Sequence, residues 1–496
     1  MRVCIINTGG TIACAGDPLA PMPSARFAEA AGRLLTPSLM AAMPDLRLHF
    51  DTGLAFDSPS GTLDSTDLRP VDWCRIAGRI LDLYADHDGF VVLHGTDTMD
   101  YTASALPFLL NVFDPDGLGR AVLSKPVVLT GAQLPLFRET AAGPVLNAGG
   151  DGWANVTGAV QTARLRLPEV ALFFDGRLWR GNRALKVSTT RFAAFDSPHL
   201  APLAESGIGV RHGPAVPLNG PPAPDRALDD PAAMALARDQ LDAVEAGLGE
   251  NVVIELPVTP ADHASPAPPL AALIDAALAA GARGLVLTGY GEGNVPAGAG
   301  GIASALQRAV DGGVTVMIGS RVIGGSVGTF HYAAGAWMAR TGAVAAGDMT
   351  PVAAFAKLSI LLAAAAHHGW DGRAIRALLS RSLTGESSSR DRLSGGEVLH
   401  PGMALHAADG GAVLDNDPAD GLTLRDGAGA QVWAVPGPGR LVLRDRPVFL
   451  GHDGATLWAA PADLPGGILI LTGHPVPALT LHDPAGRAAP AVIAGL

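Results

Sequence analysis

Short apolar runs alternate with amphipathic stretches through the first part of the chain, at the spacing expected of βα units. The apolar runs predict strands at Val3–Asn7, Leu46–Phe50, Gly89–Leu93, Pro126–Leu129 and Val170–Phe174. The stretches between them predict helices at Pro70–Ala85, Met99–Phe113 and Asn155–Arg164. This alternation predicts an α/β fold with a doubly wound parallel sheet.

A Pro-rich, non-periodic stretch, Gly213–Pro224, then predicts an inter-domain linker. The alternation resumes beyond it, and predicts strands at Val252–Glu255, Gly284–Leu287 and Val314–Ile318. Helices are expected at Leu270–Ala280, Ile302–Val310, Pro351–Ala366 and Asp371–Leu379. After Ser387, short apolar runs are separated by Gly, Pro and Asp without helical periodicity, which predicts a small β-sandwich or barrel.

These patterns divide the chain into four regions. We predict an N-terminal α/β domain with the candidate site at residues 1–188 and a linker region at 189–250. A smaller α/β domain is expected at 251–386 and a β-rich accessory module at 387–496. The predicted fold class is therefore α/β, with two doubly wound parallel-sheet domains and a C-terminal all-β module.

Charge and cysteine content narrow the function. The net charge of −12, without a basic cluster, argues against a duplex nucleic-acid binder. Cys4, Cys14 and Cys74 are scattered without metal-ligand spacing, which favours a reduced compartment. The apolar helix around Val352–Ala366 carries Lys357 and is shorter than the roughly 20 residues of a membrane span. Because the first apolar run is also too short for a signal peptide, we expect a cytoplasmic protein without a membrane partner.

Two hydroxyl-rich turns follow predicted strands. Thr8–Ile12 comes after the first strand, and its two glycines permit a tight turn and close backbone approach. His94–Met99 comes after the buried strand Gly89–Leu93 and adds a carboxylate. Either turn alone is compatible with a structural role, as a threonine-lined turn or a helix N-cap. Together they can open on one crevice, because sites in open α/β sheets form at the carboxyl ends of strands.

Lys186 is the candidate base. A lysine in an apolar domain usually extends its ammonium group to the surface, but a desolvated lysine has a lowered pKa and can accept a proton. A weak hydroxyl nucleophile needs such a base, and the base needs a third group to orient it. Thr11 or Thr96 with Lys186 and Asp97 would supply this arrangement.

The paired motifs Thr8–Ile12 and His94–Met99 resemble the signature of bacterial-type L-asparaginases, nearest the cytoplasmic type I branch. The similarity extends over roughly residues 1–385 and does not include the C-terminal module. It is carried further by five segments: Leu63–Leu68, Leu129–Pro135, Asp151 to Asn155, Gly289–Asn294, and Asp348–Thr350 with Lys357.

The resemblance implies a role for each matching residue. Thr11 would attack the side-chain amide of L-asparagine, with Thr96, Asp97 and Lys186 as catalytic partners. Asp97 would also bind the substrate's α-ammonium group. The substrate-binding residues implied are Ser65, Asp64, Thr66, Ala132 and Asn294. No metal or organic cofactor is implied, and Asn294 would come from a neighbouring subunit of a homodimer or homotetramer.

One departure concerns the loop after the first threonine. Family members usually carry a tyrosine there that contacts the nucleophile, whereas Cys14–Pro23 contains none. Of the chain's four tyrosines, Tyr290 is the candidate replacement. Because this loop is altered, L-glutamine or another small amide remains an alternative substrate. A second alternative is a protein that binds amino acids but has lost the catalytic activity. An amidotransferase subunit acting on charged tRNA is less favoured, because its extra domain typically precedes the first strand.

Overall fold

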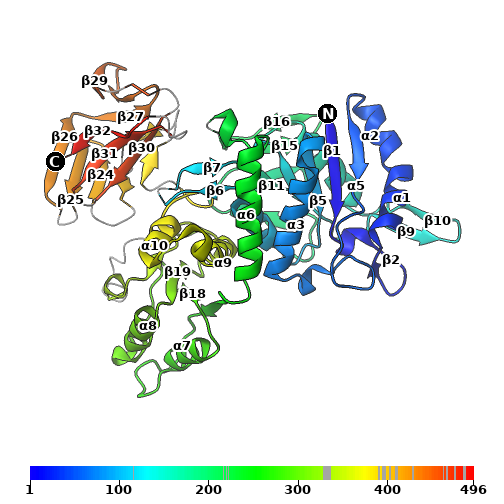
Figure 1. Cartoon of the computed structure of the whole chain (residues 1–496), viewed down its shortest axis with the longest axis horizontal. Helices are drawn as coiled ribbons and strands as arrows, with labels where there is room; N and C mark the ends of the chain where they lie inside the picture. Colours follow the sequence, from blue (N-terminus) through cyan, green and yellow to red (C-terminus); the bar gives the residue numbers. More distant parts are fainter. Residues whose placement is uncertain are drawn as a thin grey trace. The chain divides into compact units, whose positions relative to one another are not determined.

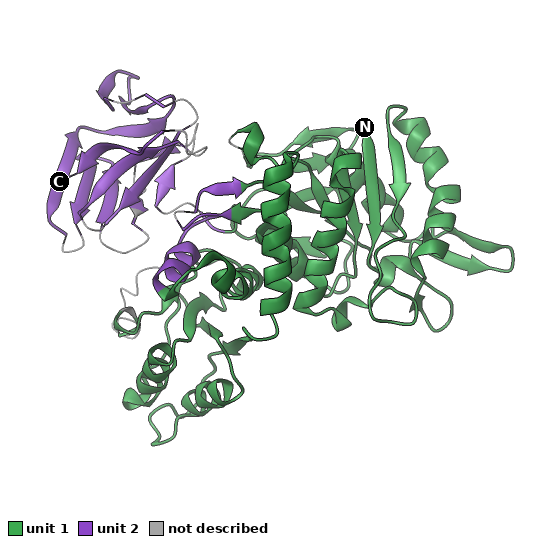
Figure 2. Cartoon of the chain, in the orientation of Figure 1, with its two compact units in different colours: residues 1–112, 121–372, 384–386 green, residues 113–120, 373–383, 387–496 purple. Residues whose placement is uncertain are grey.

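The computed structural model describes residues 1–496 except 116, 216, 219, 222, 328–336, 389–390, 394–397, 402–403, 408–411, 427–428, 462, 465–466, 474–475, 484–487 and 496. Part of the predicted linker Gly213–Pro224 lies outside the described residues. The chain forms two compact units (Figure 2). The first comprises residues 1–112, 121–372 and 384–386, and the second comprises 113–120, 373–383 and 387–496.

The first unit is built on an eight-stranded sheet of order β16-β15-β12-β11-β8-β5-β1-β4. Five strands are parallel, as predicted: β1 (Arg2–Asn7), β4 (Arg47–Phe50), β5 (Gly89–Leu93), β8 (Val127–Thr130) and β11 (Val170–Phe174). An antiparallel edge, which the sequence pattern did not predict, adds β12 (Arg177–Arg180), β15 (Ala204–Ser206) and β16 (Val210–His212).

Helices cover both faces of this sheet (Figure 1). The core on one face joins the β1, β5 and β8 side chains to α1 (Ser24–Leu34), α2 (Thr36–Ala42) and α5 (Gly152–Ala163). The other helices of this part of the unit are α3 (Pro70–Leu83), α4 (Met99–Leu109) and α6 (Pro231–Gly247), and α3 packs against both α4 and α6. The doubly wound arrangement that the alternation predicts is thereby confirmed.

A second parallel sheet of order β17-β18-β19-β20 belongs to the same unit. Its strands are β17 (Val253–Pro257), β18 (Gly284–Gly289), β19 (Thr315–Ser320) and β20 (Val344–Ala345). Its helices are α7 (Pro269–Ala279), α8 (Gly301–Asp311) and α9 (Pro351–His368), followed in the chain by α10 (Gly372–Ser380). The predicted strands and helices of this region are all present within a few residues of their expected bounds.

Helix α9 is long and apolar enough, by length and composition, to cross a membrane. In the structure 67% of it is buried, and it packs against α4 and α6. The fully buried Lys357 on this helix forms an ion pair with the fully buried Glu386, with 2.6 Å between Nζ and Oε1. These contacts are those of a core helix of this unit.

The second unit contains the predicted all-β module. Three antiparallel four-stranded sheets have the orders β21-β30-β31-β32, β22-β27-β28-β29 and β23-β24-β25-β26. Their shorter strands are β21 (Arg392–Leu393), β22 (Val398–Leu399), β23 (Ala404–His406) and β29 (Thr456–Ala459). Their longer strands are β24 (Ala412–Asp417), β25 (Gly421–Asp426), β26 (Gln431–Pro436), β27 (Gly439–Leu443), β28 (Pro447–Gly451), β30 (Ile468–Thr472), β31 (Ala478–His482) and β32 (Ala491–Gly495). One hydrophobic core includes side chains from all three sheets, among them Leu414, Leu441 and Leu471.

Two sequence predictions were wrong in detail. Helix α4 ends at Leu109, and Val112–Phe113 form the short strand β6 rather than a helical turn. The region 189–250 is not an extended linker, because it holds β15, β16 and the 17-residue helix α6. The division of the α/β part into domains at residues 188 and 251 stays a prediction.

Candidate active site

The first site loop follows the carboxyl end of β1 and carries Thr11. Gly9 and Gly10 have φ angles of 110° and 72°, which residues with a β-carbon rarely adopt. A β-carbon on Gly9 would overlap the backbone of Leu63, and one on Gly10 would overlap the backbone of Gly95. The two glycines therefore allow three loops to meet closely beside Thr11.

The hydroxyl of Thr11 differs from that of its neighbour Thr8. Thr8 Oγ1 is buried and donates to the carbonyl of Leu93 at 2.9 Å, so it ties β1 to β5. Thr11 begins the 3-10 turn η1 (Thr11–Ala13), and its side chain is partly exposed. Within the described part of the chain, its hydroxyl makes no hydrogen bond. The Thr11 hydroxyl is thus available to an external ligand.

The second site loop follows β5 and meets Lys186. The Lys186 ammonium group donates to Thr96 Oγ1 at 2.8 Å and to Asp97 Oδ1 at 2.6 Å. The Lys186 side chain is 14% exposed, whereas that of Asp97 is 56% exposed. Three of the predicted catalytic residues therefore form one hydroxyl–ammonium–carboxylate cluster, and its carboxylate is open to solvent.

Asp100 holds the backbone of Lys186 in place. Lys186 lies in the short strand β13 (Leu185–Lys186), and its backbone N–H donates to Asp100 Oδ2 at 3.1 Å. Burial raises the pKa of the Asp100 carboxyl above its usual range. The sequence analysis missed this residue, although an aspartate in the first turn of the helix after Asp97 was a signal. Lys186 also lines an open pocket of about 450 Å³ together with residues 187–190.

The loop that carries Ser65 packs closely against the first and second site loops. Ser65 is buried, and a β-carbon on Gly95 would lie 2.5 Å from its hydroxyl oxygen, so the two residues are in close contact. The Ser65 carbonyl accepts a hydrogen bond from Thr98 Oγ1 at 2.7 Å. Asp64 and Thr66 are exposed and pair with each other, because the Asp64 carboxylate accepts from the backbone N–H and hydroxyl of Thr66.

The loop after β8 brings Ala132 to the same end of the sheet. Ala132 is buried, and a β-carbon on the adjacent Gly131 would overlap the carbonyl of His94. The Gly131 carbonyl accepts from Asn155 Nδ2 at 2.9 Å. The Asp151 carboxylate accepts from two backbone N–H groups of the loop at 3.0 and 3.2 Å. This network fixes the loop beside the second threonine turn.

Asn294 is not joined to the cluster by a hydrogen bond among the described residues. It lies in the loop after β18, where its backbone exchanges hydrogen bonds of 2.7 and 2.9 Å with Tyr290. Its contribution from a neighbouring subunit, and the oligomer that this requires, stay predictions. The Tyr290 hydroxyl has no hydrogen-bond partner within the described chain. Replacement of the missing loop tyrosine by Tyr290 therefore stays a prediction.

The tyrosine-free loop after Thr11 forms a small hairpin. Its strands β2 (Cys14–Ala15) and β3 (Ala20–Pro21) are antiparallel. Leu19, at the tip, is 58% exposed. The Cys14 thiol donates to the carbonyl of Gly10 at 3.2 Å, and burial raises its pKa to about 11. Cys14 therefore supports the first site loop as a neutral thiol.

His94 is fully buried and neutral. Its Nδ1 lies 2.7 Å from the Gly95 carbonyl, which can only accept, so Nδ1 carries the proton. Its Nε2 consequently accepts from the Thr102 hydroxyl at 2.9 Å. Burial lowers the pKa of His94 to about 4. His94 also begins the second site motif, and its position at the end of a strand predicts that it orients this loop rather than transfers protons. These contacts favour that role.

Acidification is expected to destabilise the protein through His94. The folded-state pKa of His94 is about 4, and the unfolded value is 6.5. The stability that neutral His94 contributes is therefore fully present above pH 6.5 and is lost as pH falls toward 4, because the unfolded state binds the proton first. Between about pH 7.5 and about pH 5 the loss is about 2 kcal/mol. The measurement is the free energy of unfolding by denaturant at both pH values, for the wild type and His94→Gln. If the free energy of unfolding depended equally on pH in both proteins, His94 would not have the lowered pKa, because the other histidines contribute equally to each protein.

The site has the properties of an α/β enzyme whose reacting groups lie beyond the carboxyl ends of parallel strands. A hydroxyl without a hydrogen bond among the described residues, a second hydroxyl bonded to an ammonium group, and an exposed carboxylate lie on loops that contact one another. Such a set can attack a carbonyl group, move a proton and bind a cationic substrate group.

Comparison with known proteins defines the family. Residues 2–214 match the family model for the asparaginase N-terminal domain, and residues 270–381 match that for the glutaminase/asparaginase C-terminal domain. L-asparaginase 1 of Escherichia coli K12 is 34% identical over 391 residues, which cover 78% of this chain and 98% of that protein. The chain therefore belongs to the asparaginase family and is an amidohydrolase of that type.

Two further comparisons agree with this assignment. The crystal structure of L-asparaginase I from Vibrio cholerae has a TM-score of 0.54 at 28% identity, and covers 78% of this chain and 99% of that one. A glutamyl-tRNA(Gln) amidotransferase subunit of Aeropyrum pernix is 31% identical, over 78% of this chain and 80% of that protein. The relatives of this chain therefore include proteins named as L-asparaginases and one named as an amidotransferase subunit.

Proposed function

We propose that this protein hydrolyses the side-chain amide of L-asparagine to L-aspartate and ammonia, with Thr11 as the nucleophile. The observation that carries the proposal is the bridge from Lys186 to both Thr96 and Asp97, beside a turn that leaves the Thr11 hydroxyl unpartnered within the described chain. Membership of the asparaginase family supports the same chemistry.

The first step forms an ester. Thr11 Oγ1 attacks the side-chain carbonyl carbon while its proton passes through the Thr96 hydroxyl to Lys186 Nζ, and Lys186 takes part in this step as the neutral amine. The tetrahedral intermediate expels ammonia when the amide nitrogen accepts a proton from the same groups, which leaves an aspartyl ester on Thr11. Backbone N–H groups of the closely packed glycine loops are suitable donors to the developing oxyanion.

The second step releases the product. A water molecule, deprotonated by the Thr96–Lys186 pair, attacks the ester carbonyl, and Thr11 leaves with a proton. Overall, one water is consumed and one ammonia is formed. Because both steps use the same pair of groups, loss of either group is expected to slow both.

Substrate selection rests on charge. The exposed Asp97 carboxylate is suited to the α-ammonium group of a free amino acid. The buried Ser65 and its neighbouring backbone N–H groups are suited to the α-carboxylate, and the Ala132 carbonyl to the leaving amide. Asp64 and Thr66 stabilise the turn that carries Ser65, through the hydrogen bonds between them.

L-Glutamine is the second candidate substrate. The hairpin between β2 and β3 lacks a tyrosine and presents the 58% exposed Leu19 at its tip. With no tyrosine in this loop, a substrate with one more methylene group is the second candidate. Discrimination by one methylene is worth only about 1–3 kcal/mol, so both amides are included in the test.

The test is release of ammonia and of the matching acid from L-asparagine, L-glutamine and D-asparagine by the purified full chain. We expect equal amounts of ammonia and L-aspartate from L-asparagine, and a lower kcat/KM for the other two substrates. A preparation of Thr11→Ala, purified in parallel, controls for contaminating amidases.

Each outcome decides between functions. Faster release from L-glutamine would replace the asparaginase proposal by a glutaminase. Binding of L-asparagine in calorimetry, without ammonia release by folded protein, would identify a non-catalytic amino-acid-binding protein. Neither binding nor release with any of the three would overturn the proposal for free amino acids altogether.

A further inference from the structure

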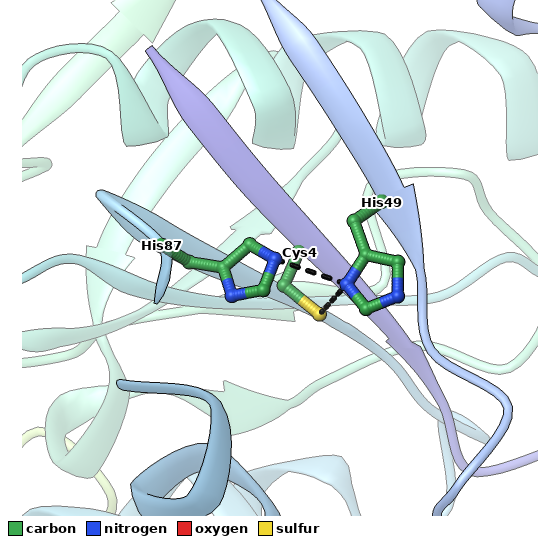
Figure 3. Close-up of side chains that lie close together, drawn as sticks. All are labelled: Cys4, His49 and His87. Atoms are coloured by element: carbon green, nitrogen blue, oxygen red, sulfur yellow. Dashed lines mark hydrogen bonds between the residues drawn. The ribbon is translucent and has the colours of Figure 1, made fainter. Parts of the chain in front are cut away.

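A cysteine and two histidines converge at a second place in the α/β unit. Cys4 on β1 lies directly opposite His49 on β4 in the parallel pairing of the two strands. His87 follows the 3-10 turn η3 (Tyr84–Asp86) and precedes β5. Figure 3 shows the three side chains pointing toward one another. Their candidate ligand atoms all lie within 4.8 Å of one another.

The hydrogen bonds of this cluster join the three candidate ligand atoms and fix the tautomer of His87. His87 Nδ1 lies 2.9 Å from the carbonyl of Leu83, which can only accept, so Nδ1 carries the proton and Nε2 accepts a hydrogen bond from His49 Nδ1–H. Metal binding replaces this hydrogen bond, and the His49 proton then moves to its Nε2. His49 Nδ1 lies 3.0 Å from this Nε2 and 3.7 Å from Cys4 Sγ. A backbone carbonyl that fixes the tautomer in this way is the usual outer partner of a metal-binding histidine.

We propose that Cys4, His49 and His87 bind a divalent transition-metal ion of the zinc type, with the fourth coordination position open to water. Zn–N bonds of about 2.0–2.1 Å and Zn–S bonds of about 2.3 Å at tetrahedral angles separate two nitrogens by about 3.3 Å and nitrogen from sulfur by about 3.6 Å. The observed separations of 3.0 and 3.7 Å are close to these values.

Accessibility and ligand chemistry favour the same ion. Cys4 and His87 are buried, whereas His49 is exposed and gives a metal ion access from solvent. One thiolate and two imidazoles suit zinc better than calcium or magnesium, which prefer oxygen ligands. The nearby Asp51 carboxylate is already engaged by Arg79 and by the backbone N–H groups of residues 53 and 54. Water is therefore the available fourth ligand.

Metal binding must displace one proton. Burial raises the pKa of the Cys4 thiol to about 12, so the thiol is protonated in the metal-free protein near neutral pH. Formation of the Cys4–metal bond therefore releases one proton to solvent. The positive Arg79 side chain, which interacts with Cys4, is paired with Asp51 and adds little net positive charge beside the metal.

The cluster is separate from the active-site loops. Cys4 lies within β1 and His87 precedes β5, whereas Thr11 and Thr96 follow the carboxyl ends of these strands. A bound ion would connect β1, β4 and the turn before β5 without contacting substrate. We therefore expect it to stabilise the fold and to leave kcat unchanged.

The experiment is a titration of the tag-free, metal-depleted full chain with Co²⁺, followed by competition with Zn²⁺. We expect a thiolate-to-cobalt absorption band that saturates at one equivalent and is lost when Zn²⁺ is added. Cys4→Ser should abolish the band, and His49→Asn should weaken binding by about tenfold or more. Cys74→Ser is the matched control, because Cys74 is equally buried and lies outside the cluster.

Two results would overturn the proposal. One is absence of the band in wild-type protein at a several-fold excess of Co²⁺. The other is an unchanged band in His49→Asn, whose substitution at an exposed residue leaves the fold intact even if Cys4→Ser does not fold. As a second readout, Zn²⁺ should raise the Tm of the wild type and of Cys74→Ser but not that of His49→Asn. None of these measurements depends on the amidohydrolase activity.

Discussion

Replacement of Thr11 by alanine is expected to lower kcat/KM for L-asparagine by about 10,000-fold or more, the loss seen when a hydroxyl nucleophile is removed from an acyl-transfer site. The remaining groups can still bind substrate, so the loss should appear mainly in kcat. Folding should change by no more than about 0.5 kcal/mol, because the partly exposed Thr11 hydroxyl makes no hydrogen bond within the described chain. Steady-state ammonia release and denaturant unfolding measure the two effects.

Thr11→Ser is the control for this prediction. It keeps the attacking oxygen and removes only a methyl group, so we expect it to retain far more activity than Thr11→Ala. A Thr11→Ala protein that is folded and still active within tenfold of wild type would exclude Thr11 as nucleophile. Thr96 would then be the next hydroxyl to test, since it is already bonded to Lys186.

The two threonine turns could be predicted because their positions depend on local signals. The turns follow β1 and β5: β5 has the expected bounds Gly89–Leu93, and β1 ends at the expected Asn7. A motif that follows such a run lies at the strand's carboxyl end in any parallel sheet. The contact between Lys186 and Asp97 joins residues 89 positions apart. No local pattern encodes that separation. The grouping of Lys186 with Asp97 came from the chemistry that a hydroxyl nucleophile needs and from the family resemblance.

Errors in the predicted elements have physical causes. Helix α4 is buried on nearly every face, so the apolar run gives no amphipathic contrast to mark its end before β6. Helix α6 was not predicted, because the Pro-rich stretch before it led to the prediction of a linker for the whole region 189–250. Its start was nevertheless encoded, because Asp230 caps the helix by accepting from the backbone N–H groups of Ala232 and Ala233, and Pro231 occupies the first helical position.

The Cys4 cluster illustrates what spacing rules cannot detect. Cys4 is 45 residues from His49, and His49 is 38 residues from His87. Metal-binding motifs are recognised in sequences when ligands are close together along the chain. Here the register between β1 and β4 places Cys4 opposite His49, and the turn before β5 adds His87. Spacing rules therefore predicted no metal site at Cys4, because neither His49 nor His87 is close to it in the sequence.

Replacement of Lys186 by methionine is expected to lower kcat by about 100- to 10,000-fold, the range for loss of a general acid–base group. Methionine keeps much of the apolar stem but leaves Thr96 and Asp97 without their shared donor. The matched control is Lys125→Met. Lys125 is 16% exposed and pairs with Asp229 at 2.8 Å, while Lys186 is 14% exposed and pairs with Asp97 at 2.6 Å. Only the Lys186 change should affect the rate of ammonia release.

A double-substitution cycle tests whether Thr96 and Lys186 act as one unit. If the 2.8 Å hydrogen bond between them carries the proton, Thr96→Val combined with Lys186→Met should cost little more than the larger single loss. Independent roles would instead multiply the two losses. Lys186→Arg adds a further distinction, because a guanidinium group keeps the positive charge but cannot be deprotonated in a protein. Activity close to wild type in Lys186→Arg would show that Lys186 supplies charge alone, and proton transfer would then have to be assigned to another group.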